Sequence, residues 1–173
     1  MKKRILTAVL AAALVTGTCA APVSAKEEKT YTVGICQLVQ HDALDAATKG
    51  FEDAITEKMG DSVKFDEQNA QGDSNTCSTI INSFVSEGAD LILANATASL
   101  QAAAAGTSDI PILGTAVTEY GVALGIDDFD GTVGGNISGT SDLAPLDEQA
   151  DMLHELFPDA KNVGLLYCSA EPN

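Results

Sequence analysis

Two hydrophobic patterns alternate along most of the chain. In one, a short segment is largely apolar; in the other, apolar residues recur at steps of three and four. The first pattern predicts strands over 31–38, 63–70, 91–94 and 110–114. The second predicts helices over 42–59, 74–87 and 97–105. Strand–helix units in succession predict an α/β fold with a doubly wound parallel sheet covered on both faces.

Residues that favour helix ends support these boundaries. Asp42, either Asp73 or Ser74, and Thr97 stand where side chains cap helix N-termini. Gly60 and Gly88 stand where the first two helices are expected to end. The predicted helices therefore have defined starts and stops, as elements of a folded domain do.

The pattern changes after residue 120. Glycines between 121 and 139 predict turns and short strands rather than a helix. A final helix is expected to open at Pro145 and to end at Pro158. Its apolar face comprises Leu146, Ala150, Leu153, Leu156 and Phe157. Residues 162–167 predict one more buried strand.

The first 25 residues read as a secretory signal peptide. Lys2, Lys3 and Arg4 form a positive start, residues 5–15 are apolar, and cleavage is expected after Ala25. The alternative is lipidation at Cys19, which would make the protein a lipoprotein. Both routes predict an exported protein, in the periplasm or at the extracellular face of the cell membrane.

The strongly negative net charge of the chain excludes some classes of binding partner. The formal net charge is −16, and no arginine follows Arg4. A surface this negative repels phosphate backbones, which argues against nucleic-acid binding. It also argues against docking of the folded part on anionic membranes.

The cysteines and acidic groups do not have metal-site spacing. Cys36, Cys77 and Cys168 are far apart in sequence and are expected to be small buried residues, with a Cys36–Cys77 disulfide as the alternative. The acids at 127–130 lack the spacing of a calcium loop. We expect no metal.

Motifs of catalysis and cofactor binding are absent from the sequence. The segment after the first strand has no Gly-x-Gly-x-x-Gly, and neither a phosphate loop nor a Gly-x-Ser-x-Gly elbow occurs. His41 stands beside acids that suit helix capping better than proton transfer, and His154 lies among acids on a helix expected at the surface. The sequence therefore predicts no cofactor and no enzymatic activity.

Neutral hydrogen-bonding residues recur where the predicted strands end. They occur in the segments 37–41, 69–73, 95–97 and 115–118, mixed with small and apolar residues. Ligands of open parallel sheets sit at the carboxyl ends of the strands. This composition predicts a small-molecule binding cleft, with ordinary loop polarity as the alternative.

Several segments together resemble the substrate-binding proteins of bacterial ABC importers, in the group associated with tryptophan or tyrosine uptake. The resemblance rests on the run 33–51 and on the later segments 69–73, 89–97, 110–118, 135–142 and 162–173. It implies a two-lobed periplasmic-binding fold. In that frame, 30–142 is the first lobe, 143–173 is a crossover helix with the first strand of an incomplete second lobe, and the chain is an N-terminal fragment.

The resemblance implies a function and a site. The expected function is to bind an amino acid, of the aromatic class, between the lobes and deliver it to a membrane permease; an extracytoplasmic sensor domain is the alternative. We expect a monomer. Because the mature chain has no arginine, backbone N–H groups and hydroxyls are expected to hold the ligand carboxylate. The predicted ligand-binding residues are Gln37, Leu38, Val39, His41, Thr97, Thr115, Ala116, Val117, Ser169 and Glu171.

Overall fold

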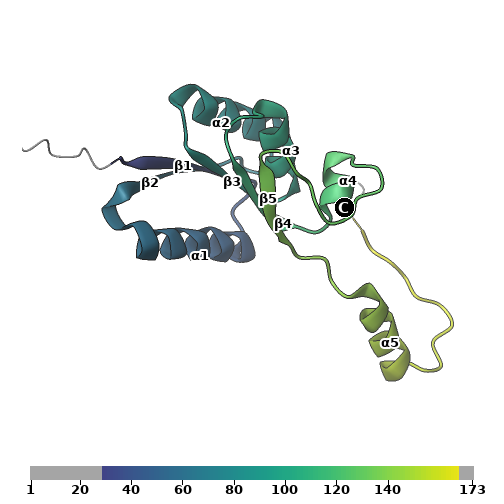
Figure 1. Ribbon diagram of the computed structural model, residues 1–173. Coiled ribbons are helices and arrows are strands. Elements are labelled where there is room, and N and C mark those ends of the chain that lie inside the picture. Colours follow the sequence, from purple (N-terminus) through teal and green to yellow (C-terminus); the bar gives the residue numbers. More distant parts are fainter. Residues whose placement is uncertain (1–28, 168–173) are drawn as a thin grey trace, which may run out of the picture.

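The computed structural model describes residues 29–167 as a five-stranded parallel sheet with helices on both faces (Figure 1). The strand order is β2-β1-β3-β4-β5. The strands are β1 (Tyr31–Gln37), β2 (Val63–Asn69), β3 (Leu91–Asn95), β4 (Ile112–Val117) and β5 (Ile137–Ser141). The helices are α1 (Asp42–Met59), α2 (Ser74–Glu87), α3 (Thr97–Gly106), α4 (Tyr120–Leu124) and α5 (Leu146–Leu156), with a short 3-10 turn, η1 (Gly60–Ser62).

The core lies in two layers, one on each face of the sheet. On one face α2 and α3 bury the larger cluster, in which Ile81, Phe84 and Leu100 are at most 1% exposed. On the other face α1 packs through Phe51 against a smaller cluster around Ile35 and Leu93. The apolar strands β1 and β3 lie between these layers, and so the prediction of a doubly covered parallel sheet is confirmed (Figure 1).

Three helix starts differ from the predictions or extend them. His41, rather than Asp42, caps α1: its Nδ1 accepts a hydrogen bond from the backbone N–H of Ala43. Asp73 caps α2, as one of the two predicted candidates. The prediction of Thr97 as a cap is wrong, because the chain turns into α3 at Ala96 and Thr97 is the first helical residue.

Two segments of the second half depart from the sequence reading. The glycine-containing region holds the short helix α4, which was not predicted. Its start is stabilised by Glu119, whose carboxylate accepts hydrogen bonds from the backbone N–H groups of Gly121 and Val122. The predicted strand over 162–167 is absent; Leu165 and Leu166 are 88% and 102% exposed there.

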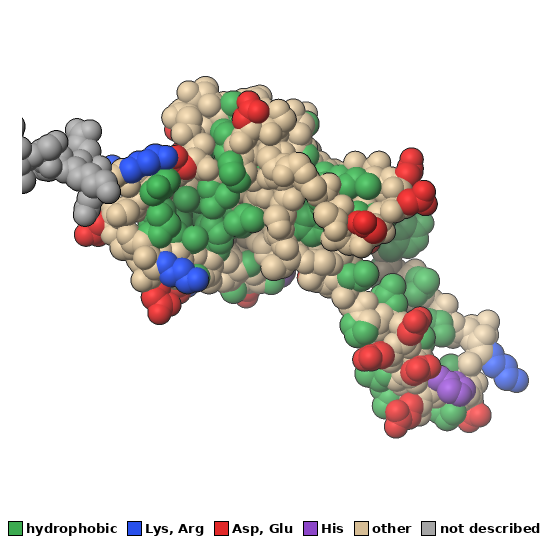
Figure 2. Space-filling model, in the orientation of Figure 1, with side chains coloured by type: hydrophobic (Ala, Val, Ile, Leu, Met, Phe, Trp, Pro, Cys, Tyr) green, Lys and Arg blue, Asp and Glu red, His purple; other side chains and the backbone are tan. Residues whose placement is uncertain are grey.

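The helix α5 forms where it was predicted, but it buries none of its residues. It stands away from the sheet (Figure 1), and its surface shows apolar side chains beside acidic ones (Figure 2). Leu146 and Leu156 are each 63% exposed. Among residues 29–167, no helix is long and apolar enough to cross a membrane. The predicted signal peptide lies outside the described residues.

Candidate functional site

At the carboxyl edge of the sheet, backbone hydrogen bonds tie the residues that follow β1 and β3 to the neighbouring strands. The backbone N–H of Leu38 donates to the carbonyl of Asn95 at 3.1 Å. The N–H of Ala96 donates to the carbonyl of Thr115 at 2.9 Å. These bonds bring together the strand ends that the sequence analysis assigned to one cleft.

Strained backbone marks the same edge. Three non-glycine residues at or near the carboxyl ends of the strands have positive φ angles. The angle is 56° at Gln71 after β2, 88° at Ala96 after β3, and 53° at Ala116 near the end of β4. Residues with a Cβ avoid this region, and each such residue costs about 1–3 kcal/mol. Within residues 29–167 the other non-glycine residue with positive φ is Asp128. Strain of this kind concentrates at ligand sites.

Helix α3 points its N-terminus at this edge. Ala96 has no side chain that can accept a hydrogen bond from the first turn, whereas α1, α2 and α4 are capped by His41, Asp73 and Glu119. The N-terminus of a helix carries partial positive charge and N–H groups that have no acceptor within the helix. An anionic group suits this position.

Gln37 lies in a buried polar network rather than in a cleft. Its side-chain nitrogen donates to the carbonyl of Val39 and to the carboxylate of Asp45, while its oxygen accepts from Thr48 Oγ1 at 2.7 Å and from Asn95 Nδ2 at 3.3 Å. The residue is 1% exposed. The prediction that its side chain contacts ligand is therefore wrong for this arrangement, because its hydrogen-bonding capacity is already used.

Asn95 belongs to the same network. Its Nδ2 also donates to Thr48 Oγ1 and to the carbonyl of Leu44, each at 2.9 Å. Its Oδ1 is buried and has no hydrogen-bond partner among the described protein atoms. The network ties the end of β1, the end of β3 and the first turns of α1 into one unit directly behind the edge.

The other predicted residues divide between the surface and the core. Val39 is 38% exposed and His41 is exposed, while Leu38, Thr115 and Ala116 are half-buried. Thr97 is 5% exposed. The side chain of Val117 is wholly buried in the core, so its prediction as a ligand contact holds at most for its backbone. Ser169 and Glu171 lie outside the described residues.

Two cavities lie near β4 and β5, and of the predicted residues only Thr115 lines one of them, the smaller. The smaller, about 270 Å³, lies on the α1 face between Phe51, Leu113, Thr115 and Thr140. The larger, about 580 Å³, lies beside β5 and is lined by α4 and by the glycine-containing turns. Tyr120 lines the larger one and donates its hydroxyl to the carbonyl of Thr140 at 3.2 Å. Burial, with the Asp142 charge second, raises the pKa of Tyr120, so this hydroxyl stays protonated.

The sequence reasoning missed Tyr120, Thr140 and Ser141. Ser141 donates its hydroxyl to the carbonyl of Thr118 at 2.7 Å, which fixes the exit of β5 against the end of β4. The available signal was the polar run at 138–141 after an apolar residue, but it lies among glycines that favour turns. Within residues 29–167, no group of three or more His, Cys, Asp or Glu residues could hold a metal ion.

A comparison with known protein families matches residues 32–173 to the family described as ABC transporter substrate binding protein. The match spans most of the chain. The chain belongs to this family. The resemblance drawn from its motifs is thereby confirmed.

Individual relatives agree with this assignment. The chain is 44% identical over 149 residues to a tyrosine-binding protein of Clostridioides difficile (strain R20291), covering 84% of this chain and 43% of that protein. It is similar to a solved ABC domain in complex with L-Trp from Streptococcus pneumonia, with a TM-score of 0.75 and 34% identity over 84% of this chain and 50% of that one.

A second solved structure is the ligand-free, open form of a substrate binding protein with adhesive properties from Clostridium difficile. It matches with a TM-score of 0.69 and 41% identity, over 82% of this chain and 49% of that chain. The chain thus spans about half the length of the relatives it matches. The described sheet is consistent with a single lobe of a periplasmic-binding fold.

Proposed function

We propose that this chain supplies the first lobe of an extracytoplasmic binding protein that delivers an aromatic amino acid to an ABC permease. The observation that carries the proposal is the N-terminus of α3, which lacks a side-chain cap and lies between the left-handed residues Ala96 and Ala116 at the carboxyl edge. An amino acid offers a carboxylate to that position. The class of side chain is taken from the relatives named for tyrosine and crystallised with L-Trp.

The ligand carboxylate would be held without an arginine. The candidates are the N–H groups of the first turn of α3, the amides of Ala116 and Val117, and the hydroxyl of Thr115. Thr115 Oγ1 already lies 3.5 Å from Thr140 Oγ1, so a ligand oxygen would join an existing pair of hydroxyls. The aromatic ring would pack on Leu38 and Val39, with His41 beside it.

The proposal also divides the chain into a signal peptide, a first lobe and the start of a second lobe. Residues 1–25 would be the signal peptide, 30–142 the first lobe, and 143–173 the crossover into a second lobe that closes over the ligand. Ser169 and Glu171 would then approach from that lobe, and Glu171 would suit the ligand ammonium group. Support comes from β5, whose carboxyl end lies at the same edge and leads directly to α5 (Figure 1).

Binding and closure account for this function without chemistry on the ligand. A two-lobed protein closes when its ligand contacts both lobes, and the ligand stabilises the closed form by its difference in affinity for the two states. The permease would distinguish the closed form from the open one. The strained residues suit such a role because they pre-position backbone groups before ligand arrives.

Calorimetry on the full-length protein tests the proposal, with L-tryptophan, L-tyrosine and L-alanine as ligands. We expect the aromatic amino acids to bind and the variant Thr115→Ala, which removes the hydroxyl proposed to hold the carboxylate, to weaken that binding about tenfold, or about 1.4 kcal/mol. Thr79→Ala is the matched control, because Thr79 is exposed on α2. Affinity of the Thr115→Ala variant within about threefold of wild type, roughly 0.7 kcal/mol, would show that this hydroxyl does not hold the ligand.

A further inference from the structure

Two cysteines from different elements meet in the core at one hydroxyl. Cys36 lies in β1 and Cys77 in the first turn of α2, and both are free thiols with no exposed surface. Cys36 Sγ lies 3.6 Å from Ser99 Oγ, and Cys77 Sγ lies 3.7 Å from the same oxygen. Ser99, in the first turn of α3, is also fully buried.

We propose that Cys36 and Cys77 are a disulfide-forming pair that links β1 to α2 when the chain folds in the presence of a disulfide oxidant. The two sulfurs approach the same oxygen inside the larger core cluster, and Cys77 is a direct side-chain neighbour of Cys36. An S–S bond would replace these two S···O contacts. Sequence spacing alone left this pairing as an alternative to two separate buried thiols.

The pKa of the Cys36 thiol and the burial of both cysteines determine at which stage of folding the disulfide can form. Burial raises the pKa of the Cys36 thiol to about 12; the Ser99 hydrogen bond opposes this shift and the neighbouring Cys77 adds to it. Thiolate is the attacking species in disulfide exchange, so the raised pKa slows the reaction of Cys36 in the folded core, and burial keeps reagents away from both thiols. The bond should therefore form during folding, before α2 closes over β1.

The chemistry balances with a disulfide such as oxidised glutathione as the oxidant. One cysteine thiolate attacks the glutathione disulfide, giving a mixed disulfide and one glutathione thiolate. The second cysteine then attacks the mixed disulfide, forming the Cys36–Cys77 bond and releasing a second glutathione. Two protons leave the protein thiols, and two electrons pass to the oxidant.

A bond at this place would tie the central strand pair to the helix layer. It would close a loop of roughly 40 residues that contains α1 and β2, which lowers the conformational freedom of the unfolded chain. We expect the oxidised chain to melt about 5–10 °C above the reduced chain.

The test is to refold the 173-residue chain from denaturant with reduced and oxidised glutathione, quench it with an alkylating reagent, and map the tryptic peptides. The four cysteines fall in four different tryptic peptides, with Cys36 in 30–49, Cys77 in 65–161 and Cys168 in 162–173. We expect peptides 30–49 and 65–161 to be joined, and the variant Cys168→Ser to give the same pair and the same rise in melting temperature.

Three results would overturn the proposal. The first is both thiols alkylated after oxidative refolding; the second is either cysteine joined to Cys19, Cys168 or glutathione instead. The third is a linked pair that melts no higher than the reduced chain. Because the map is read on the unmutated chain, it does not depend on whether Cys36→Ser or Cys77→Ser folds. None of these results depends on ligand binding, so the proposed function stands or falls separately.

Discussion

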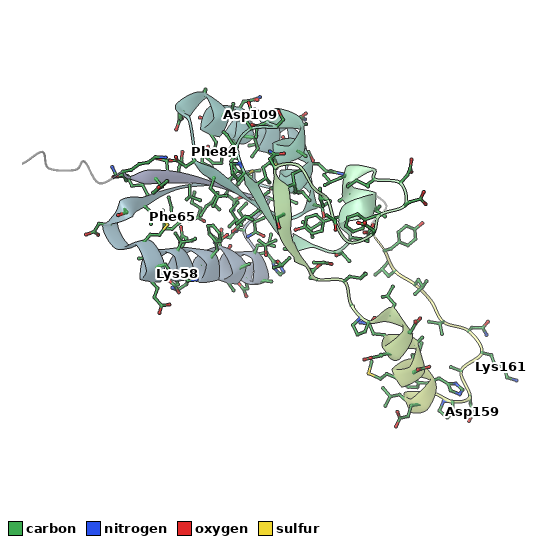
Figure 3. All side chains as sticks on the ribbon, in the orientation of Figure 1. Lys58, Phe65, Phe84, Asp109, Asp159 and Lys161 are labelled. Atoms are coloured by element: carbon green, nitrogen blue, oxygen red, sulfur yellow. The ribbon has the colours of Figure 1, made fainter. Side chains whose placement is uncertain are left out.

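Gly34 is the position in β1 where the sheet touches the ring of Phe84 on α2, and Gly34→Ala tests how the core is held together. A Cβ at Gly34 would lie 2.6 Å from both Cδ2 and Cγ of Phe84, well inside the 3.4–4 Å of ordinary contact. The ring is 1% exposed and belongs to the larger core cluster (Figure 3). Neither the strand nor the ring can therefore yield freely.

The expected cost follows from these contacts. Adding a methyl group to a closely packed core costs about 1–3 kcal/mol in strain and side-chain displacement. The loss of glycine's backbone freedom in the unfolded chain offsets about 0.5–1 kcal/mol of this. The ring has to shift by most of an ångström beneath α2, so we expect a net loss near the middle of the range, about 2 kcal/mol.

Urea unfolding followed by circular dichroism measures this change as a shift of the midpoint at constant slope. Gly50→Ala is the matched control, because Gly50 is exposed within α1 and an added Cβ would meet nothing within 4 Å. We expect that variant to be about 0.5–1 kcal/mol more stable than wild type. A Gly34→Ala chain as stable as wild type would refute the packing argument.

A double variant identifies the clashing partner. Phe84→Leu removes the flat ring, so Gly34→Ala should cost less in the Phe84→Leu background than in wild type. Equal costs in both backgrounds would mean that the strain arises elsewhere in β1.

Three further predictions follow from individual contacts. Thr48→Val should cost about 1–3 kcal/mol in urea unfolding, because it removes the two buried hydrogen bonds that Thr48 Oγ1 makes with Gln37 and Asn95. The exposed Thr79→Val should change stability by less than about 0.5 kcal/mol. The backbone N–H and hydroxyl of Thr76 hold the pKa of Asp73 below its usual range. The stability this cap contributes is thus present above the ordinary aspartate pKa and lost as the pH falls through the lowered one. The melting-temperature deficit of Asp73→Ala should accordingly shrink in acid, and a constant deficit would argue against the cap. In hydrogen exchange, the amides of α5 should exchange far faster than those of α3, since α5 buries none of its residues; equal protection would contradict its exposure.

The fold was largely predictable because the signals that specify it are local. The apolar runs of β1 and β3 and the helical spacing of α2 each depend on burial, which periodicity reports directly. Gly60 and Gly88 end their helices as expected, with positive φ angles that a glycine adopts at low cost. The sheet was therefore recognisable before any contact between its elements was known.

The site was less predictable because its features arise from tertiary contacts. The residue type at positions 96 and 116 does not indicate a left-handed backbone, because alanine avoids that region unless tertiary contacts impose it. The sequence places Gln37 in the cleft because ligands of open parallel sheets sit at the carboxyl ends of the strands. In the structure, however, the Gln37 side-chain oxygen accepts hydrogen bonds from Thr48 and Asn95, which lie on two other elements. Hydrogen bonds between a buried amide and residues of other elements cannot be predicted from the sequence of one strand.

The predicted strand over 162–167 is absent, which shows that an apolar run alone does not determine a strand. Leu165 and Leu166 have the apolar character of a buried strand, but a strand is stable only beside another strand and under a covering layer. The exposed leucines of α5 have the same property, since their spacing fits a partner surface that residues 29–167 do not supply. In two-lobed proteins of this family a second sheet would meet both needs. We therefore propose that the exposed apolar residues of α5 and of 162–167 contact a second lobe. That lobe would lie at the same edge of the sheet where the ligand is proposed to bind.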